Sequence, residues 1–390
     1  MRVLGIVGLA TLFVACDSGQ ASSPDDLGNT GGDAGAGTGA VGGAGGAGGS
    51  GGSGASGGSA GSGGSAGSGG SAGSGGSAGS GGSAGTAPDA GVTRRYRVQG
   101  NKILDQDGKE HRFVGISRPS LEWNPQGESL FERDYQNIAS WGANVVRVPL
   151  NQVSWRDWQA YPRTIDRQIE WAHKYGMDVI LDLHWSEGTA GSEPGQKRMA
   201  DANSRTFWQQ IAERYKGDGS ILFELYNEPH DVSWDVWKNG GSSGDGFTVV
   251  GMQALYDTVR ATGAENLVII GGLDHAYDLK GVRSYRITGN NIVYATHPYD
   301  YSNKQAGNWP TDWGFLVATD PVMITEFGVT TGDCGTGYYS SVLDYADRNG
   351  VHWIGWAWYV SSCAFPSLIT NYEGTPTAAG NVIRQRLQSY

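Results

Sequence analysis

Short runs of apolar residues recur along the second part of the chain, and longer amphipathic segments lie between them. Runs of this length, rich in Val and Ile, are typical of buried β-strands. Helices are expected between the runs, for example at 164–176 and 204–217, where each amphipathic segment ends in a glycine. The pattern predicts strands at 113–117, 144–150, 178–185, 221–229, 266–272, 291–299, 322–329 and 352–360.

Strands that alternate with helices indicate the α/β class, and eight such units in one domain favour a closed (β/α)8 TIM barrel. An open, doubly wound sheet is the alternative. That fold commonly has a glycine-rich phosphate-binding turn after its first strand, whereas the segment GISRPS lacks this spacing. We therefore predict a TIM barrel over residues 92–390, beginning with a small β-hairpin whose two alternating runs flank LDQDGK.

Residues 17–91 have a different composition, because Gly, Ser and Ala dominate and the unit GGSAGS repeats from Gly57 onward. Such a segment cannot bury enough apolar surface to offset the entropy lost on ordering. A repeat of six residues also occurs in β-helices, but those need apolar side chains that stack inward. We therefore predict a disordered Gly/Ser/Ala-rich linker that tethers the folded domain.

The first residues, 1–16, have the features of an export signal: an early Arg, an apolar run and a small residue before Cys16. The apolar run is too short to span a membrane. The sequence LFVAC resembles a bacterial lipobox, with Phe13 where Leu is usual, and a plain secretory signal is the alternative. We expect an exported, cell-surface lipoprotein in which a lipid on Cys16 is the sole link to the membrane.

Composition narrows the classes of ligand. The formal net charge is −11, and Lys and Arg are scattered without a basic stripe, so a nucleic-acid partner is not expected. The histidines lack metal-ligand spacing such as H-E-x-x-H, and we predict neither a metal nor another cofactor. With 14 tryptophans, the chain is better suited to a neutral ligand with flat apolar faces than to a polyanion. We expect a monomer.

Polar side chains mark the ends of several predicted strands, where barrels of this class place their functional groups. Each alone also fits a helix cap, a structural ion pair or a core histidine. Together they would converge on one rim, and burying them would be costly unless they paired. The candidates are Arg147, His184, Trp185, Asn227, Glu228, His297, Tyr299, Glu326, Trp356 and Trp358.

Two of these candidates, Glu228 and Glu326, end the fourth and seventh predicted strands, which lie nearly opposite each other in an eight-stranded barrel. Two carboxyls suffice to hydrolyse a glycosidic bond. One protonates the leaving oxygen, and the other attacks the anomeric carbon to form a glycosyl-enzyme that water releases. This retaining route needs carboxyls about 5–5.5 Å apart.

The motifs LYNEPH (225–230) and ITEFG (324–328) resemble the acid/base and nucleophile signatures of glycoside hydrolase clan A. THPY (296–299), the Arg of NVVRVPL and the His of LDLHW make the chain similar to family 5 of that clan, over about residues 95–390. The resemblance implies a cellulase-like endoglucanase that needs no cofactor.

The resemblance also implies a role for each matching residue. Glu228 would be the acid/base and Glu326 the nucleophile, kept ionised by Arg147 and hydrogen-bonded by Tyr299. Asn227 would bind the sugar 2-hydroxyl, His297 would position the acid/base and His184 would contact the sugar on the glycone side. Either Trp356 or Trp358 would form the aromatic floor, with Trp358 favoured. We also expect the negative charge of Glu326 to raise the pKa of Glu228.

Tryptophans in the segments after the strands favour a long glucan as substrate, because indole faces stack on sugar rings, although about half of them would serve packing alone. They are Trp123, Trp155, Trp158, Trp234, Trp237, Trp309 and Trp313. Cellulose or mixed-linkage β-glucan fits best. The alternatives are an endo-β-mannanase, a xyloglucanase or another β-glucanase of the clan, and, in a different class, a non-catalytic surface glycan-binding protein.

Cys334 follows the seventh strand and Cys363 follows the eighth, so a disulfide between these neighbouring loops would brace the rim of the barrel. Two free thiols are the alternative.

Overall fold

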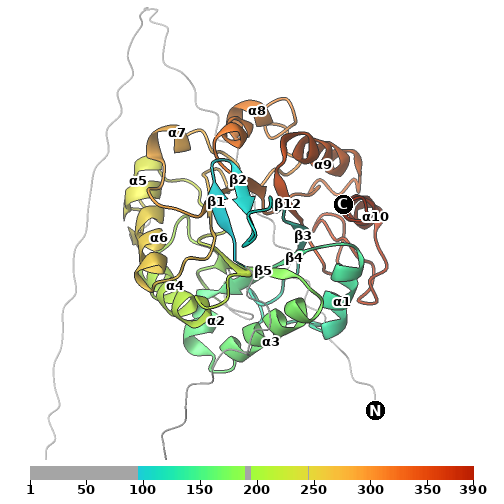
Figure 1. Ribbon diagram of the computed structural model, residues 1–390, viewed down its shortest axis with the longest axis horizontal. Coiled ribbons are helices and arrows are strands. Elements are labelled where there is room, and N and C mark those ends of the chain that lie inside the picture. Colours follow the sequence, from blue (N-terminus) through green and yellow to red (C-terminus); the bar gives the residue numbers. More distant parts are fainter. Residues whose placement is uncertain (1–94, 189–194, 245) are drawn as a thin grey trace, which may run out of the picture. The chain divides into compact units, whose positions relative to one another are not determined.

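The computed structural model describes residues 95–188, 195–244 and 246–390. In this part of the chain eight parallel strands form a closed barrel, and the last pairs with the first (Figure 1). The predicted TIM barrel is therefore confirmed. The strands are β3 (Val114–Ser117), β4 (Val145–Asn151), β5 (Asp178–Trp185), β6 (Ile221–Glu224), β9 (Val268–Gly271), β10 (Ile292–Thr296), β11 (Val322–Ile324) and β12 (His352–Gly355).

Helices surround the barrel in chain order (Figure 1). Their ends follow local rules: the Asp201 side chain caps α4, and α9 stops at Gly350, whose φ of 66° suits glycine. The helices are α1 (Glu132–Ser140), α2 (Gln152–Asp157), α3 (Tyr161–Lys174), α4 (Ala202–Tyr215), α5 (Trp234–Asn239), α6 (Met252–Ala261), α7 (Val282–Tyr285), α8 (Trp309–Asp312), α9 (Gly337–Asn349) and α10 (Ala378–Leu387), with a 3₁₀ turn, η1 (Gly314–Ala318). None of the described helices is long and apolar enough to cross a membrane.

A hairpin precedes the barrel, but its turn comes earlier than predicted. Strands β1 (Arg97–Gln99) and β2 (Lys102–Leu104) pair around Gly100, whose φ is 62°. The predicted turn at LDQDGK also reverses the chain, although only one bridge, from Leu104 to Glu110, follows it. A second short antiparallel pair, β7 (Gly241–Ser242) and β8 (Thr248–Val249), lies between α5 and α6.

The barrel interior has two layers because alternate residues of each strand point inward. The layer nearer the strand starts is apolar and includes Val145, Ile180 and Leu222. Ile103 of β2 packs onto this cluster, so the hairpin covers that end of the barrel. One inward position further along, β4 has Arg147, β5 has Asp182 and β6 has Glu224, all fully buried. This alternation therefore places apolar side chains at the end of the barrel where the strands begin and polar side chains toward the end where the strands finish.

The larger apolar core lies between the strands and the helices. Trp141 and Trp208 are buried in it, and Trp171 packs against it. Three of the tryptophans that were candidates for sugar stacking, Trp237 on α5, Trp309 on α8 and Trp313, are fully buried and serve packing, so they present no face to a ligand. The others, Trp123, Trp155, Trp158 and Trp234, keep some exposure.

The strands end earlier than predicted. The predicted strands 221–229, 322–329 and 352–360 stop at Glu224, Ile324 and Gly355, because the chain leaves the sheet there to form the rim. A disulfide joins Cys334 and Cys363 and links two of these rim loops, as predicted. The predicted signal segment, Cys16 and the linker lie outside the described residues.

Candidate active site

Arg147 organises the polar layer of the barrel. Its guanidinium is fully buried and donates hydrogen bonds to three side chains: Glu224 Oε2 at 2.6 Å, Glu326 Oε1 at 2.6 Å and Asn227 Oδ1 at 2.7 Å. Asp182 Oδ2 lies 2.9 Å from Nη2. Burial disfavours the charged guanidinium, but the carboxylates of Asp182, Glu224 and Glu326 outweigh it and raise the pKa of Arg147 further above its usual range. The planar fork therefore fixes residues from four strands relative to one another.

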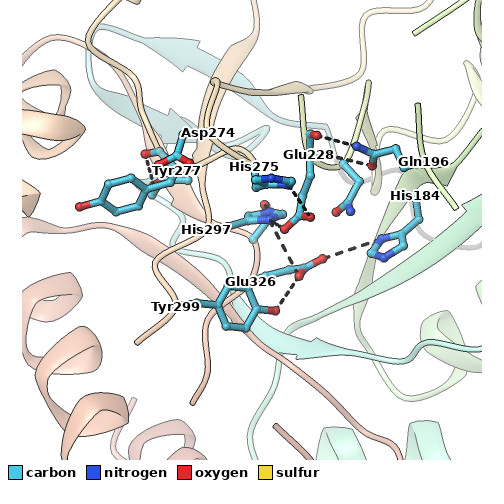
Figure 2. Close-up of polar contacts among 12 residues, drawn as sticks. His184, Gln196, Glu228, Asp274, His275, Tyr277, His297, Tyr299 and Glu326 are labelled. Atoms are coloured by element: carbon cyan, nitrogen blue, oxygen red, sulfur yellow. Dashed lines mark hydrogen bonds and ion pairs between the residues drawn. The ribbon is translucent and has the colours of Figure 1, made fainter. Parts of the chain in front are cut away.

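Glu326 follows β11 and is almost fully buried. One carboxylate oxygen accepts from Arg147, and the other accepts from the Tyr299 hydroxyl at 2.7 Å (Figure 2). His184 Nδ1 lies 3.8 Å from Oε1. Because each oxygen accepts a hydrogen bond from a different side chain, the carboxylate has a defined orientation.

Glu228 follows β6, and its side chain is 27% exposed. Oε1 lies 3.0 Å from His297 Nδ1, and the other His297 nitrogen lies 2.8 Å from the Thr325 hydroxyl. The backbone of Glu228 is held as well: its N–H donates to Gln196 Oε1 at 3.1 Å, and the Gln196 amide donates back to its carbonyl at 2.5 Å (Figure 2). A paired amide contact of this kind limits both rotation and sliding of the loop.

The two carboxyls face each other. One oxygen of Glu228, one oxygen of Glu326 and one nitrogen of His297 lie within 4.8 Å of one another. This upper bound on the distance between the two oxygens is compatible with the carboxyl spacing of about 5–5.5 Å that a nucleophile and an acid/base need on the two sides of a glycosidic bond.

The electrostatics of Glu228 differ from the expectation. Burial favours its neutral form, but contacts with His275 and His297 outweigh burial and hold the pKa of Glu228 well below its usual range. Conversely, burial disfavours a charged His297, but the surrounding carboxylates, Glu326 foremost, raise the pKa of His297 to about 9. The prediction of a raised pKa was therefore wrong for this state, because the two imidazoles next to Glu228 outweigh the effect of burial.

His184 and Trp356 lie together at the rim, and their rings stack with centroids 5.4 Å apart and planes 5° from parallel. Asp182 orients this histidine through Nδ1 at 2.7 Å. Trp358, the favoured candidate for the aromatic floor, is fully buried and packs edge-on against Trp141 at 4.8 Å, in the core outside the barrel. That prediction was wrong because β12 ends at Gly355, so strand alternation no longer applies beyond it.

Aromatic rings extend this side of the site. Trp185, which is 8% exposed, lies 6.3 Å from Trp123, and Trp123 packs against Tyr359 at 5.3 Å. Phe365 lies 5.9 Å from Trp356 and 5.3 Å from Tyr359. These rings come from the end of β5 and from the loops that follow β3 and β12, and they form a cluster of packed aromatic side chains near the carboxyl pair.

Glu228, His297 and Glu326 are close enough together to be considered as metal ligands. Their oxygens and nitrogen, however, are already engaged. Both Glu326 oxygens accept from Arg147 and Tyr299, and His297 Nδ1 faces Glu228. A cation would have to replace these donors next to a buried guanidinium, so the chemistry of the trio suits proton transfer better than metal binding.

Four residues of the site were missed by the sequence reasoning. Asp182 and Glu224 could have been found, because an acidic residue at an inward position of an apolar strand signals a buried partner. Gln196 and His275 carry no comparable signal, since they lie in loops whose conformation depends on their neighbours.

Comparison with known proteins identifies related sequences and structures. A sequence profile of the cellulase family (glycosyl hydrolase family 5) matches residues 104–362. The chain is 25% identical over 322 residues to an endoglucanase of Paenibacillus polymyxa, covering 67% of this chain and 79% of that protein. It is 25% identical over 320 residues to endoglucanase E-5 of Thermobifida fusca, and this match covers 76% of this chain and 64% of that protein. Against endoglucanase MaCel5A of a Microbulbifer species, it spans 50% of the relative's length.

Among solved structures, the β-glucanase SdGluc5_26A of Saccharophagus degradans resembles the chain with a TM-score of 0.64 and 25% identity. The match covers 76% of this chain and 94% of that one. The same β-glucanase has also been crystallised with cellotetraose.

Proposed function

The chain belongs to the cellulase family, glycosyl hydrolase family 5, and we propose that it cleaves internal β-1,4-glucosidic bonds of cellulose or mixed-linkage β-glucan by a retaining, double-displacement mechanism. Glycoside hydrolase activity of the endoglucanase type is the family's property. The bond cleaved, the stereochemistry and the role of each residue are our proposal.

One observation carries the mechanism: a Glu228 oxygen and a Glu326 oxygen lie within 4.8 Å of each other at the barrel rim. An inverting enzyme keeps its carboxyls about 6.5–9.5 Å apart so that a water molecule fits between substrate and base. The shorter separation leaves room for direct attack by a carboxylate and supports retention.

In the first step, Glu326 attacks the anomeric carbon while Glu228 protonates the glycosidic oxygen, which departs with the leaving sugar. Arg147 and Tyr299 orient the nucleophile through the hydrogen bonds described above. The Asn227 amide oxygen accepts from Arg147, so its NH₂ group is free to donate to the sugar 2-hydroxyl. His184 would contact the sugar on the glycone side.

Glu228 needs a proton for this step, and His297 supplies one across the 3.0 Å contact. In the free enzyme the proton belongs to the pair, with the imidazole charged and the carboxyl ionised. A bound glucan expels water, which penalises this ion pair and favours the neutral pair in which Glu228 is the acid.

In the second step, the ionised Glu228 removes a proton from water, and the resulting hydroxide attacks the anomeric carbon and breaks its bond to Glu326. This frees Glu326 and leaves Glu228 protonated. The proton of Glu228 then returns to His297, which restores the ion pair of the free enzyme.

The aromatic cluster that includes Trp123, Trp185 and Trp356 supports a glucan substrate, because flat aromatic rings match the apolar faces of sugars whose hydroxyl groups are equatorial. Relatives named endoglucanase and β-glucanase support the same class.

The test measures new reducing ends after incubation of the full chain with carboxymethyl cellulose, barley β-glucan, mannan and xyloglucan. We expect cleavage of the first two, and loss of about 10³-fold or more in Glu228→Gln and Glu326→Gln. NMR of the first product should show the β-anomer. Cleavage of mannan or xyloglucan alone would contradict the substrate, an α-anomer would contradict the mechanism, and glycan binding without cleavage would favour a non-catalytic binding protein.

We further propose that the protein is exported and held at the cell surface by a lipid on Cys16, with residues 17–91 as the tether. The support is the lipobox-like LFVAC and the glycine-rich composition. Metabolic labelling with palmitate should mark the wild type and not Cys16→Ser. Unlabelled wild type in the culture medium would favour plain secretion.

A further inference from the structure

Glu228 has a second imidazole beside it. His297 lies deep in the barrel and approaches Oε1, whereas His275 Nδ1 lies 3.7 Å from the other oxygen, Oε2 (Figure 2). The side chains of His275 and Glu228 are 28% and 27% exposed, while that of His297 is fully buried. His275 therefore lies on the more exposed side of the carboxyl, next to the oxygen that His297 does not contact.

The backbone that presents His275 is unusual. Asp274, His275 and Ala276 all have left-handed φ angles, of 56°, 57° and 59°. L-residues avoid this region, and a run of three without a glycine persists only where surrounding contacts enforce it. Such strain is commonly stored at functional sites.

Contacts on two sides enforce this turn. The His275 N–H donates to the carbonyl of Pro229, the residue after Glu228, at 3.1 Å. On the other side, Lys304 is 5% exposed, and its ammonium donates to the Asp274 carbonyl at 2.9 Å and lies 3.3 Å from Asp274 Oδ2. The same ammonium lies over the Tyr277 ring at 4.9 Å. Burying a lysine ammonium costs free energy, so its use here indicates that the conformation of this turn matters to the protein.

The imidazole of His275 is also held. His230 stacks on it with centroids 4.3 Å apart and planes 24° from parallel. Burial of His230 and the nearby His275 lower the pKa of His230 to about 4, so it packs as a neutral ring. The stacked ring limits rotation of His275 and leaves Nδ1 directed at Glu228.

We propose that His275 is a positioning residue for the acid/base, whose Nδ1 holds Oε2 of Glu228 in line with the glycosidic oxygen of a bound glucan. This inference rests on the proposed function. Because His297 and His275 contact different oxygens, they act as two supports, and loss of either lets the carboxyl swing about its side chain. The effect should appear only where the leaving group needs a proton.

The test uses two substrates with the same sugar and different leaving-group basicity, phenyl β-cellobioside and 2,4-dinitrophenyl β-cellobioside, with barley β-glucan as reference. Dinitrophenolate departs without protonation, whereas phenolate and sugar alkoxide need the acid. For His275→Phe, which keeps the stack on His230, we expect kcat/KM to fall about 10–100-fold on the phenyl glycoside and β-glucan. On the dinitrophenyl glycoside it should change less than about 3-fold.

His275→Asn provides the conservative variant. Asn tolerates the left-handed backbone, and its amide nitrogen occupies nearly the place of Nδ1. We expect it to recover most of the activity on the phenyl glycoside. His111→Phe, at the opposite end of the barrel, makes the same exchange away from the site and should match the wild type on all three substrates.

Equal losses on the two aryl glycosides, or an Asn variant as impaired as the Phe variant, would show a general structural role and overturn the inference. So would a His275→Phe enzyme with unchanged kinetics, while leaving the proposed function intact. A wild type that cleaves neither the β-glucan nor the glycosides would contradict the proposed function itself.

Discussion

Replacing Arg147 with lysine should both destabilise the barrel and disable the carboxyl pair. The guanidinium donates to Glu224 and Glu326 at 2.6 Å and to Asn227 at 2.7 Å. Lysine keeps the positive charge but replaces the planar fork with a single ammonium on a different stem. At least one of these buried, charge-assisted hydrogen bonds is then lost, and each contributes about 1.5–3 kcal/mol.

From these contacts we expect the free energy of unfolding to fall by about 2–4 kcal/mol, including the cost of the carboxylate left unpaired. For a domain of this size that corresponds to a decrease in Tm of about 4–8 °C. The carboxylate of Glu326 and the amide of Asn227 lose their shared anchor, and a displacement of about 1 Å can cost roughly 100-fold in rate.

The assay pairs thermal unfolding followed by circular dichroism with kcat/KM on barley β-glucan, measured well below Tm. Arg205→Lys is the control, because Arg205 is exposed on α4 and donates to the Thr258 hydroxyl at 3.1 Å. If Arg147→Lys matched this control in Tm and retained kcat/KM within about threefold, the idea that the fork organises the site would be refuted.

Three other properties of the protein can be tested in the same way. The folded-state pKa of His297, about 9, lies above its usual value of about 6.5, so the stability that His297 contributes is complete below pH 6.5 and is lost as pH rises through 9. The free energy of unfolding of the wild type, measured in urea, should fall by up to about 3 kcal/mol over that range, and that of His297→Gln should fall clearly less. Replacing Cys334 and Cys363 with serine removes a disulfide between residues 29 apart in the chain and should lower the free energy of unfolding by about 3 kcal/mol. A reductant should lower the Tm of the wild type but not that of the double serine variant. Trp356→Ala should raise KM for cello-oligosaccharides, whereas Trp358→Ala should lose about 3–5 kcal/mol of stability and keep the KM of the wild type. A raised KM in Trp358→Ala alone would show that Trp358, and not Trp356, contacts the substrate.

The carboxyl pair illustrates what local patterns along the chain can predict. Glu228 and Glu326 follow apolar runs, and the parallel order of the strands brings all such ends to one rim. The inward alternation Val145–Arg147 and Ile180–Asp182 is visible in the sequence as well, although Asp182 is not among the predicted site residues. Such patterns repeat within a few residues, so they can be recognised without knowing what the chain packs against.

The two tryptophans after β12 illustrate the opposite case. Strand alternation would point Trp356 and Trp358 to the same side, but the strand ends at Gly355 and the two rings diverge, one toward His184 and one toward Trp141. The pKa of Glu228 is a similar case. The pKa of Glu228 is lowered by His297 and by His275, and His275 lies 47 positions away on a strained turn that Lys304 holds from the next loop.

The sequence by itself determined the fold class, the strand and helix order, the end of the barrel that carries the chemistry and the two carboxyls, because each depends on periodicity or on residue type at a strand end. Only the tertiary structure decided which ring faces the site, that Gln196 and His275 support Glu228, and how protons divide between Glu228 and His297. These properties depend on distances of 3–4 Å between segments far apart in the chain. Such distances exist only once the barrel has closed and its loops have packed against one another.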